Sequence, residues 1–264
     1  MIIIGELINA SRKKMRAAME QRDEVTLAKV AQDQAEAGAD YIDVNAGELV
    51  GREAEYLTWL VEIVQGVTDK PCCLDSPDPA AIEAALAVHK GTPMINSISL
   101  EKERFERIIS LLPGTDLKVI ALCMSDKGMP VTTDERLEIA DKLINQLVKV
   151  NVKTENIFVD PLVQPLSVAT NYGQYFLDAV EQIMTRFPGI HTACGLSNIS
   201  YGLPNRALIN QTFMAMAIDK GLDGAIVDPL NRQMMDVIHA AEALANRDEY
   251  CLKYLNYYRA TKQN

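Results

Sequence analysis

The chain has 264 residues, of which 48% are hydrophobic and 23% charged, a balance typical of a folded globular protein. Its formal net charge of −10 argues against extended contacts with nucleic acid or with acidic membrane surfaces. The sequence contains neither a signal peptide nor a run of roughly 20 apolar residues that could span a membrane, so we expect a cytoplasmic protein.

Eight short hydrophobic segments rich in β-branched residues alternate with helical patterns along the chain. They are predicted as strands that start at Ile2, Tyr41, Pro71, Met94, Leu117, Ile157, His191 and Gly224. Helices are predicted between them at 26–37, 53–65, 80–90, 100–112, 134–150, 172–187 and 205–220. Strands that alternate with helices are parallel, and no low-complexity linker interrupts the pattern. It therefore predicts an α/β fold, a single-domain (β/α)₈ TIM barrel over residues 1–264.

Polar residues stand at the ends of nearly all the predicted strands, which is where a TIM barrel builds its active site. A lone Asp or Asn there often caps a helix or forms a turn, and Asp126 and Asp228 fit that structural role best. Several carboxylates around one mouth should repel one another, which predicts raised pKa values and a ligand rich in hydrogen-bond donors. No lysine or arginine is expected among them before Arg206. The strand-end residues are Glu6, Asn9, Asp43, Asn45, Asp75, Asn96, Ser125, Asp126, Asp160, Ser197, Asn198 and Asp228.

A pterin is a ligand of this kind, because its 2-amino group and N3–H form an edge that one carboxylate can bind through both oxygens. Asp75, Asn96 and Asp160 supply the carboxylates and the amide that such a ring requires. A phosphorylated sugar would instead need a glycine-rich loop after the seventh or eighth strand, and the glycines there do not form one. The five cysteines include no CxxC pair and the three histidines are far apart, so we expect reduced core thiols and no bound metal.

Longer motifs resemble the methyltetrahydrofolate:corrinoid-protein methyltransferases of acetogenic and methylotrophic anaerobes over nearly the whole chain. They are IIGELIN, DVNAG, LDSPDPAAIEAAL, MINSIS, FVDPL, GLSNISYGLPNRALINQTFMAMAIDKG and DGAIVDP. The chain also resembles the pterin-binding module of cobalamin-dependent methionine synthase and, more weakly, dihydropteroate synthase. The resemblance implies a pterin-binding TIM barrel in anaerobic one-carbon metabolism. Its substrate would be tetrahydrofolate or 5-methyltetrahydrofolate, and the chain itself would bind no metal.

The resemblance also assigns roles to seven residues. Asn198 would lie near N5, the methyl-bearing nitrogen of the folate, where its amide is the expected catalytic group. Glu6 and Asp43 would lie behind the pterin contacts or at the rim of the mouth. The remaining folate contacts are Asp75, Asn96, Asp160 and Arg206.

The resemblance implies two partners, a corrinoid protein and a second copy of the chain in a homodimer. The sequence has no DxHxxG motif for a corrinoid's lower ligand, so another protein is expected to carry the corrinoid and to dock over the mouth. The direction of transfer stays open. So does the first methyl donor: a methyl ether through O-demethylation, a betaine, a methylated amine, or the iron–sulfur protein of the acetyl-CoA pathway. Two alternatives to this function are a dihydropteroate synthase-like condensing enzyme, whose expected lysine is missing, and a non-catalytic folate-binding protein.

Overall fold

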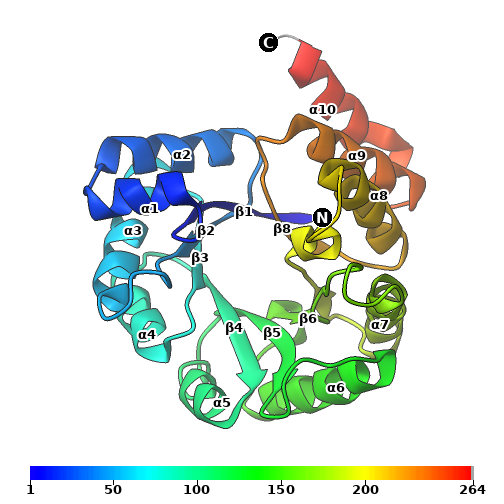
Figure 1. The fold of residues 1–264 in the computed structure, drawn as a ribbon, viewed down its shortest axis with the longest axis horizontal. Coiled ribbons are helices and arrows are strands. Elements are labelled where there is room, and N and C mark those ends of the chain that lie inside the picture. Colours follow the sequence, from blue (N-terminus) through cyan, green and yellow to red (C-terminus); the bar gives the residue numbers. More distant parts are fainter. Residues whose placement is uncertain (263–264) are drawn as a thin grey trace.

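The computed structural model describes residues 1–262 and folds them into a barrel of eight parallel strands surrounded by helices (Figure 1). Hydrogen-bonded neighbours follow the order β7-β6-β5-β4-β3-β2-β1-β8. The predicted TIM barrel is confirmed, and each predicted strand is present. The strands are β1 (Ile2–Asn9), β2 (Tyr41–Asn45), β3 (Cys72–Asp75), β4 (Met94–Leu100), β5 (Lys118–Ser125), β6 (Ile157–Asp160), β7 (His191–Thr192) and β8 (Gly224–Val227).

The barrel closes between its two end strands through a short contact after β7. Ile226 donates its backbone N–H to the carbonyl oxygen of Cys194 at 2.9 Å, next to an isolated parallel bridge between Gly195 and Ile226. A Cβ atom at Gly224 would lie 3.2 Å from the Thr192 carbonyl oxygen, so a residue without a side chain allows this close approach. Because β7 is only 2 residues long, the chain leaves the sheet early and forms an irregular segment at the mouth.

Each predicted helix is also present, but three helices were not predicted. The missed helix α1 has no capping side chain at Arg12, so its start carries none of the usual sequence signals. The other two, α9 and α10, follow the last strand, and α10 extends away from the barrel beside α9 (Figure 1). The helices are α1 (Lys13–Glu20), α2 (Glu24–Glu36), α3 (Glu53–Val67), α4 (Pro79–Val88), α5 (Lys102–Ile109), α6 (Thr133–Lys149), α7 (Tyr172–Arg186), α8 (Arg206–Asp219), α9 (Arg232–Leu244) and α10 (Leu252–Lys262).

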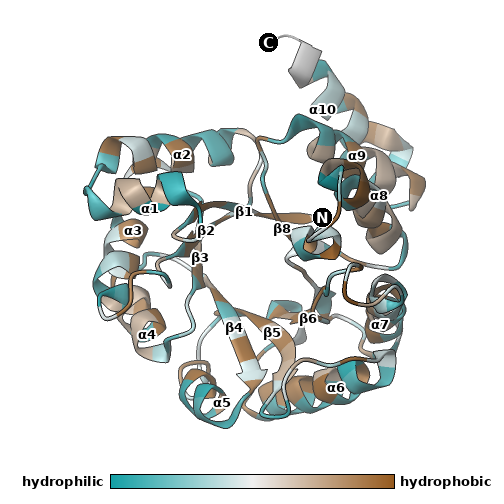
Figure 2. Ribbon diagram, viewed as in Figure 1, coloured by the Kyte–Doolittle hydropathy of each residue, from teal (hydrophilic) through white to brown (hydrophobic). Residues whose placement is uncertain are grey.

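Hydrophobic residues concentrate on the strands and on the inner faces of the helices, whereas the outer helix faces are hydrophilic (Figure 2). Inside the barrel, one layer of buried side chains forms an apolar floor beneath the mouth. Its members are Ile4, Tyr41, Cys73, Met94, Ile120, Phe158 and Ala193.

Among residues 1–262, no helix is long and apolar enough to cross a membrane. Four of the five cysteines are buried, as expected of core thiols, but Cys251 is exposed because it lies between α9 and α10, outside the barrel. Within the same residues, no three His, Cys, Asp or Glu side chains are grouped so that they could hold a metal ion.

Candidate active site

The polar residues at the mouth form the layer of inward-facing side chains directly above the apolar floor. Alternate residues of a strand face the same side, so the residue two places after each floor residue also points into the barrel. In five strands this step leads from a floor residue to a polar one that can ionise or donate a hydrogen bond. The pairs are Ile4 and Glu6 in β1, Tyr41 and Asp43 in β2, Cys73 and Asp75 in β3, Met94 and Asn96 in β4, and Phe158 and Asp160 in β6.

Four of the predicted residues form a group of two hydrogen-bonded pairs across β2, β3 and β4. The side-chain amide of Asn45 donates to Asp75 Oδ2 at 2.8 Å, and that of Asn96 donates to Asp43 Oδ1 at 3.4 Å. Asn45 Oδ1 also accepts from the backbone of Gly47 at 3.0 Å, so Asn45 links the following loop to Asp75. Asp43 is buried behind Asn96, and Asp75 and Asn96 remain the members that face open space.

A cavity of about 780 Å³ opens beside this group, a volume within the usual range for small-molecule sites. Asp75 and Asn96 form one wall, and Leu122 and Met124 of β5 form another. Leu122 is also paired in register with Asp160 on β6, which places Asp160 next to the cavity wall. The cavity therefore lies where two predicted pterin contacts meet the mouth.

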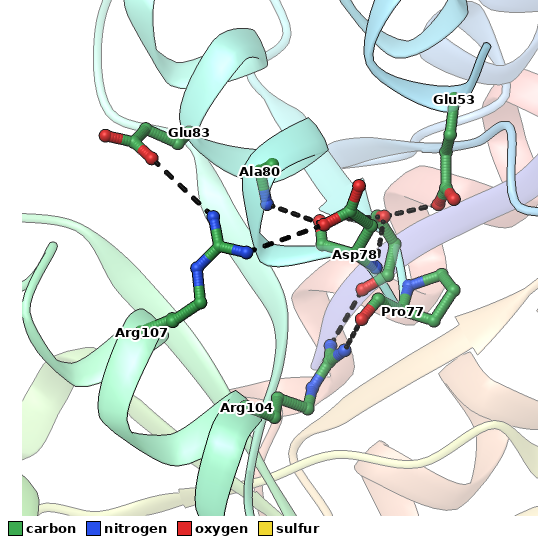
Figure 3. A network of polar contacts seen from close by, with 8 residues as sticks. Glu53, Pro77, Asp78, Ala80, Glu83, Arg104 and Arg107 are labelled. Carbon is green, nitrogen blue, oxygen red and sulfur yellow. Dashed lines mark hydrogen bonds and ion pairs between the residues drawn. The ribbon is translucent and has the colours of Figure 1, made fainter. Parts of the chain in front are cut away.

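Arg104 of α5 holds the loop that forms the outer edge of this cavity (Figure 3). Its guanidinium donates to the carbonyl oxygens of Ser76, Pro77 and Ser97 at 2.8, 2.7 and 2.8 Å. The sequence prediction placed no lysine or arginine among the strand-end residues before Arg206, but Arg104 adds a cation at the mouth. Arg104 reaches the mouth from the helix after β4 rather than from a strand end, so inspection of the strand ends alone could not find it.

Burial raises the pKa of the two best-placed aspartates into the neutral range. Loss of water raises the pKa of Asp75 to about 6, against the opposing hydrogen bond from Asn45 and the charge of Arg104. Loss of water likewise raises the pKa of Asp160 to about 7, although backbone N–H groups of Leu162 and Gly195 donate to its carboxylate. Both groups can therefore exchange a proton near neutral pH.

The pKa values of Glu6 and Asp43 are raised as well. For Asp43 the largest cause is burial, followed by the negative charge of Asp75. For Glu6 burial is opposed by Arg12, whose guanidinium donates to its carboxylate at 2.5 Å, so Arg12 is a second cation that the sequence prediction missed. The predicted rise in pKa is confirmed, but loss of water contributes more than repulsion between the carboxylates.

The predicted catalytic residue Asn198 lies in η2 (Leu196–Ser200), the short helix that follows β7. Its side chain is exposed and makes no hydrogen bond to another residue in 1–262, so its amide is available to a ligand. Arg206 holds this segment, since its guanidinium donates to the Ser197 carbonyl oxygen at 2.7 Å and to Ser200 Oγ at 3.0 Å. Both of these contacts of Arg206 are thus with the segment that carries Asn198.

The remaining strand-end aspartates have the structural roles predicted for them. Asp126 accepts the backbone N–H of Lys102 at 3.2 Å, at the start of α5. Asp228 accepts the backbone N–H of Leu230 at 2.9 Å and forms a turn. They cap a helix and shape a loop, which are the usual roles of an isolated aspartate after a strand.

Arg206→Met tests whether Arg206 acts through η2. The resemblance implies methyl transfer, whose rate should fall about tenfold because η2 no longer holds Asn198 in place without these charge-assisted hydrogen bonds. The affinity for tetrahydrofolate should change less than the rate. Arg206→Lys should retain part of the rate that Arg206→Met loses. Single-turnover rates and equilibrium binding measure the two effects separately. A loss of affinity larger than the loss of rate would instead identify Arg206 as a direct pterin contact.

Comparison with known proteins places this geometry in a family. The model of the pterin-binding enzymes matches residues 5–228. A methylcorrinoid:tetrahydrofolate methyltransferase of Eubacterium limosum is 37% identical over 264 residues, which cover 99% of this chain and 97% of the relative. A methionine synthase of Mycobacterium tuberculosis is 31% identical over 88% of this chain, a match that covers 21% of the much longer relative.

Solved structures support the fold. A dihydropteroate synthase of Xanthomonas albilineans superposes with a TM-score of 0.71 at 16% identity, with 92% of each chain covered. A dihydropteroate synthase of Coxiella burnetii gives a TM-score of 0.70 at 14% identity, with 92% of this chain and 93% of the other covered. Identities this low establish a shared barrel and nothing about the reaction. The full-length sequence match and the matching family model show that the chain belongs to the pterin-binding enzymes, in the family of the methylcorrinoid:tetrahydrofolate methyltransferases.

Proposed function

We propose that the whole chain works as one pterin-binding unit that transfers a methyl group between N5 of tetrahydrofolate and a corrinoid carried by a second protein. The full-length match to a methylcorrinoid:tetrahydrofolate methyltransferase is the observation that carries this proposal. The site supports it, because Asp75, Asn96 and Asp160 present the acceptors and the amide that a pterin edge requires.

Methylation of tetrahydrofolate requires a proton to leave N5. The lone pair of N5 attacks the methyl carbon, the methyl–cobalt bond breaks with its electron pair left on cobalt, and the N5 proton passes to a base. Asn198 would orient N5 through a hydrogen bond, but a neutral amide cannot take up the proton. With Asp160 accepting the pterin N–H groups, Asp75, whose pKa is raised to about 6, is the carboxylate that can accept the proton at neutral pH, directly or through water. The reverse direction uses the same groups.

A pyrophosphate-displacing reaction, as in a dihydropteroate synthase, fits this site less well. Such a reaction needs cationic groups aimed at the pyrophosphate. Arg104 and Arg206 instead donate to backbone carbonyl oxygens and a serine hydroxyl, and Arg12 is paired with Glu6. The guanidinium groups of these three arginines therefore already have partners within the chain.

A corrinoid on a partner protein also fits the positions of the histidines, the side chains best suited to ligate cobalt. His191 is paired with Asp223 at the start of β7, the end of the barrel opposite the mouth. His89 accepts the backbone N–H of Cys72, also at the start of its strand, and His239 stacks on Tyr257 of α10. All three histidines of the chain therefore lie away from the mouth, where the methyl group must be exchanged.

We assign the docking of the corrinoid protein to the uncharged part of the rim. Residues 161–177 and 192–205, which follow β6 and β7, contain no charged residue. They expose Val168 and Tyr201, at 71% and 65%, and a hydrogen bond of 2.6 Å from Ser167 Oγ to the Tyr201 carbonyl oxygen joins the two loops. An exposed apolar surface beside Asn198 is suited to contact with a partner.

Val168→Glu should raise the KM for the corrinoid protein about tenfold, because a charge is then buried against an apolar partner surface. The rate with free methylcob(III)alamin should not change, since the substitution lies outside the folate site. Val50→Glu, on the loop after β2, is the matched control because Val50 is 88% exposed on the charged side of the rim. Equal effects of the two substitutions on KM would contradict this docking position.

The assembly and the setting of the reaction are part of the same proposal. We place the enzyme in the cytoplasm as a homodimer, in pathways such as O-demethylation that load methyl groups onto corrinoid proteins. Leu252 and Leu255, which remain exposed on α10, support self-association of the chain.

The proposal is tested by mixing the protein with tetrahydrofolate and methylcob(III)alamin that carries a ¹³C-labelled methyl group, under anaerobic conditions. Mass spectrometry should detect labelled 5-methyltetrahydrofolate. In parallel, a pterin pyrophosphate with 4-aminobenzoate should give no dihydropteroate. Folate binding without labelled product, even with a methylated corrinoid protein, would support the non-catalytic alternative instead.

A further inference from the structure

Arg136 of α6 is the largest of the fully buried side chains, at 0% exposure. Helix α6 packs against β5 and β6 (Figure 1). The hydrogen bond of its Arg136 to the Pro161 carbonyl oxygen places the guanidinium next to the end of β6. Nε donates to the Pro161 carbonyl oxygen at 2.8 Å, and Nη2 donates to the Leu162 carbonyl oxygen at 3.3 Å and to Gln164 Oε1 at 2.6 Å. Three acceptors thus come from the four residues that follow Asp160.

The segment held by Arg136 has a backbone shape that needs support. Leu162 has a φ of +67°, a left-handed conformation that costs a non-glycine residue about 1–2 kcal/mol. In this conformation its N–H donates to Asp160 Oδ1 at 2.8 Å. The hydrogen bonds of Arg136 to the neighbouring carbonyl oxygens hold that geometry, so they fix the position of the Asp160 carboxylate indirectly.

The charge of Arg136 has no ion-pair partner among residues 1–262. The atoms that accept its hydrogen bonds are neutral oxygens, including the Thr132 carbonyl oxygen at 2.9 Å. Burial lowers the pKa of Arg136, which reflects the cost of keeping this charge away from water. A buried charge without a carboxylate partner costs stability, so a helix-packing role alone does not explain an arginine at this position.

We propose that Arg136 is a positioning residue for the folate site: it fixes the segment after β6 and directs its buried positive charge at the Asp160 carboxylate. This inference rests on the proposed role of Asp160 as a pterin contact. It adds a residue from outside the barrel that favours the ionised form of the carboxylate, the form able to accept the pterin N–H groups.

Among the titratable groups that face Asp160, Arg136 is the one that carries a charge. From β5 and from the segment after β7, Cys123 and Cys194 face the carboxylate, and burial raises the pKa of both thiols, so they stay neutral. The groups that face Arg136 itself are Cys123, Tyr172, Glu135 and Asp160. The backbone N–H groups of Leu162 and Gly195 oppose the effect of burial on the pKa of Asp160 most, and Arg136 supplies the positive charge that lowers this pKa further.

The test follows the carboxyl carbon of Asp160 by ¹³C NMR across a pH titration of the free protein, with Asp160→Asn used to assign the signal. Arg136→Met removes the charge, whereas Gln164→Glu retains the arginine and places a neutralising carboxylate beside it. Gln164→Met is the matched control, because it removes the same hydrogen-bond acceptor without adding charge. If Arg136→Met does not fold, Gln164→Glu still tests whether the charge of Arg136 acts on Asp160.

We expect the Asp160 midpoint to move upward by about 1 pH unit in Arg136→Met and in Gln164→Glu, and to stay in place in Gln164→Met and Arg136→Lys. In the two variants with a raised Asp160 midpoint, tetrahydrofolate binding should weaken as the pH falls through that midpoint, which is higher than in the wild type. Unchanged midpoints in folded Arg136→Met or Gln164→Glu would overturn the inference. If the wild type binds no tetrahydrofolate, the proposed function fails, and the NMR titration still decides the role of Arg136.

Discussion

Asp160→Asn is expected to bind tetrahydrofolate about 10-fold to 100-fold more weakly and yet to unfold at a higher temperature. The affinity falls because a charge-assisted pair to a pterin contributes about 1.5–3 kcal/mol, which the neutral amide does not replace. The stability rises because Asp160 is only 7% exposed and its carboxylate is ionised at a cost. Opposite signs for binding and stability are the signature of a residue retained for its ligand.

The pH dependence of stability follows from the direction of the pKa shift. The pKa of Asp160 is raised to about 7 in the folded protein, so the fold loses stability as the pH rises from the ordinary pKa towards 7. Above pH 7 this loss is complete, and it lowers the free energy of unfolding by about 4 kcal/mol. We therefore expect the Tm of Asp160→Asn to exceed that of the wild type by several degrees at pH 8 and by little at pH 4.

Asp228→Asn is the matched control for this prediction. It makes the same change of charge at the end of another strand, and the new amide oxygen can still accept the N–H of Leu230. At pH 8, calorimetry should give Asp228→Asn a Tm close to that of the wild type. Equilibrium binding should give it a similar affinity for tetrahydrofolate. Parallel losses of affinity and stability in Asp160→Asn would contradict a binding role for this aspartate.

Asn198→Ala should lower the rate of methyl transfer on the order of 100-fold while changing tetrahydrofolate affinity about threefold or less. Removal of one preorganised hydrogen bond to the reacting atom commonly has an effect of this size. The affinity is preserved because Asp75, Asn96 and Asp160 hold the pterin ring in this account. Asn198 is exposed and has no partner within residues 1–262, so its removal leaves no buried group unsatisfied.

Single-turnover kinetics with saturating tetrahydrofolate separate these two effects. Asn145→Ala is the matched control, because Asn145 is an exposed asparagine on α6, away from the mouth. It should transfer the methyl group at the wild-type rate. A comparable loss of affinity and rate in Asn198→Ala would mean that Asn198 contributes to binding and has no separate role at N5.

The barrel was predictable from sequence because each unit carries local signals for strand or helix. Buried strands such as Cys72–Asp75 are hydrophobic until their last residue, and Asp78 followed by Pro79 marks the start of α4. Helix α1 was not predicted, since Arg12 supplies no cap to mark its start. Helices α9 and α10 lie after the last strand, beyond the alternation that made the other helices recognisable.

The candidate site was predictable only where it comes from strand ends. The sequence pointed to Asp75 and Asp160 because they end apolar strands, and to Asn96 because it is polar within an apolar strand. Arg104 and Arg136 instead reach the site from helices. Arg136 did leave a signal in the sequence. It stands four residues before Ala140 and seven before Leu143, on the buried apolar stripe of α6, where an arginine is exceptional.

Methyl transfer is tested by the visible spectrum of methylcob(III)alamin, or of a methylated corrinoid protein, mixed with the wild-type protein and tetrahydrofolate. We predict loss of the methyl–cobalt absorbance that depends on both the protein and tetrahydrofolate and that is slow in Asn198→Ala at saturating folate. If the wild type binds tetrahydrofolate but demethylates neither corrinoid, the barrel is a folate-binding protein and the account of methyl transfer is wrong.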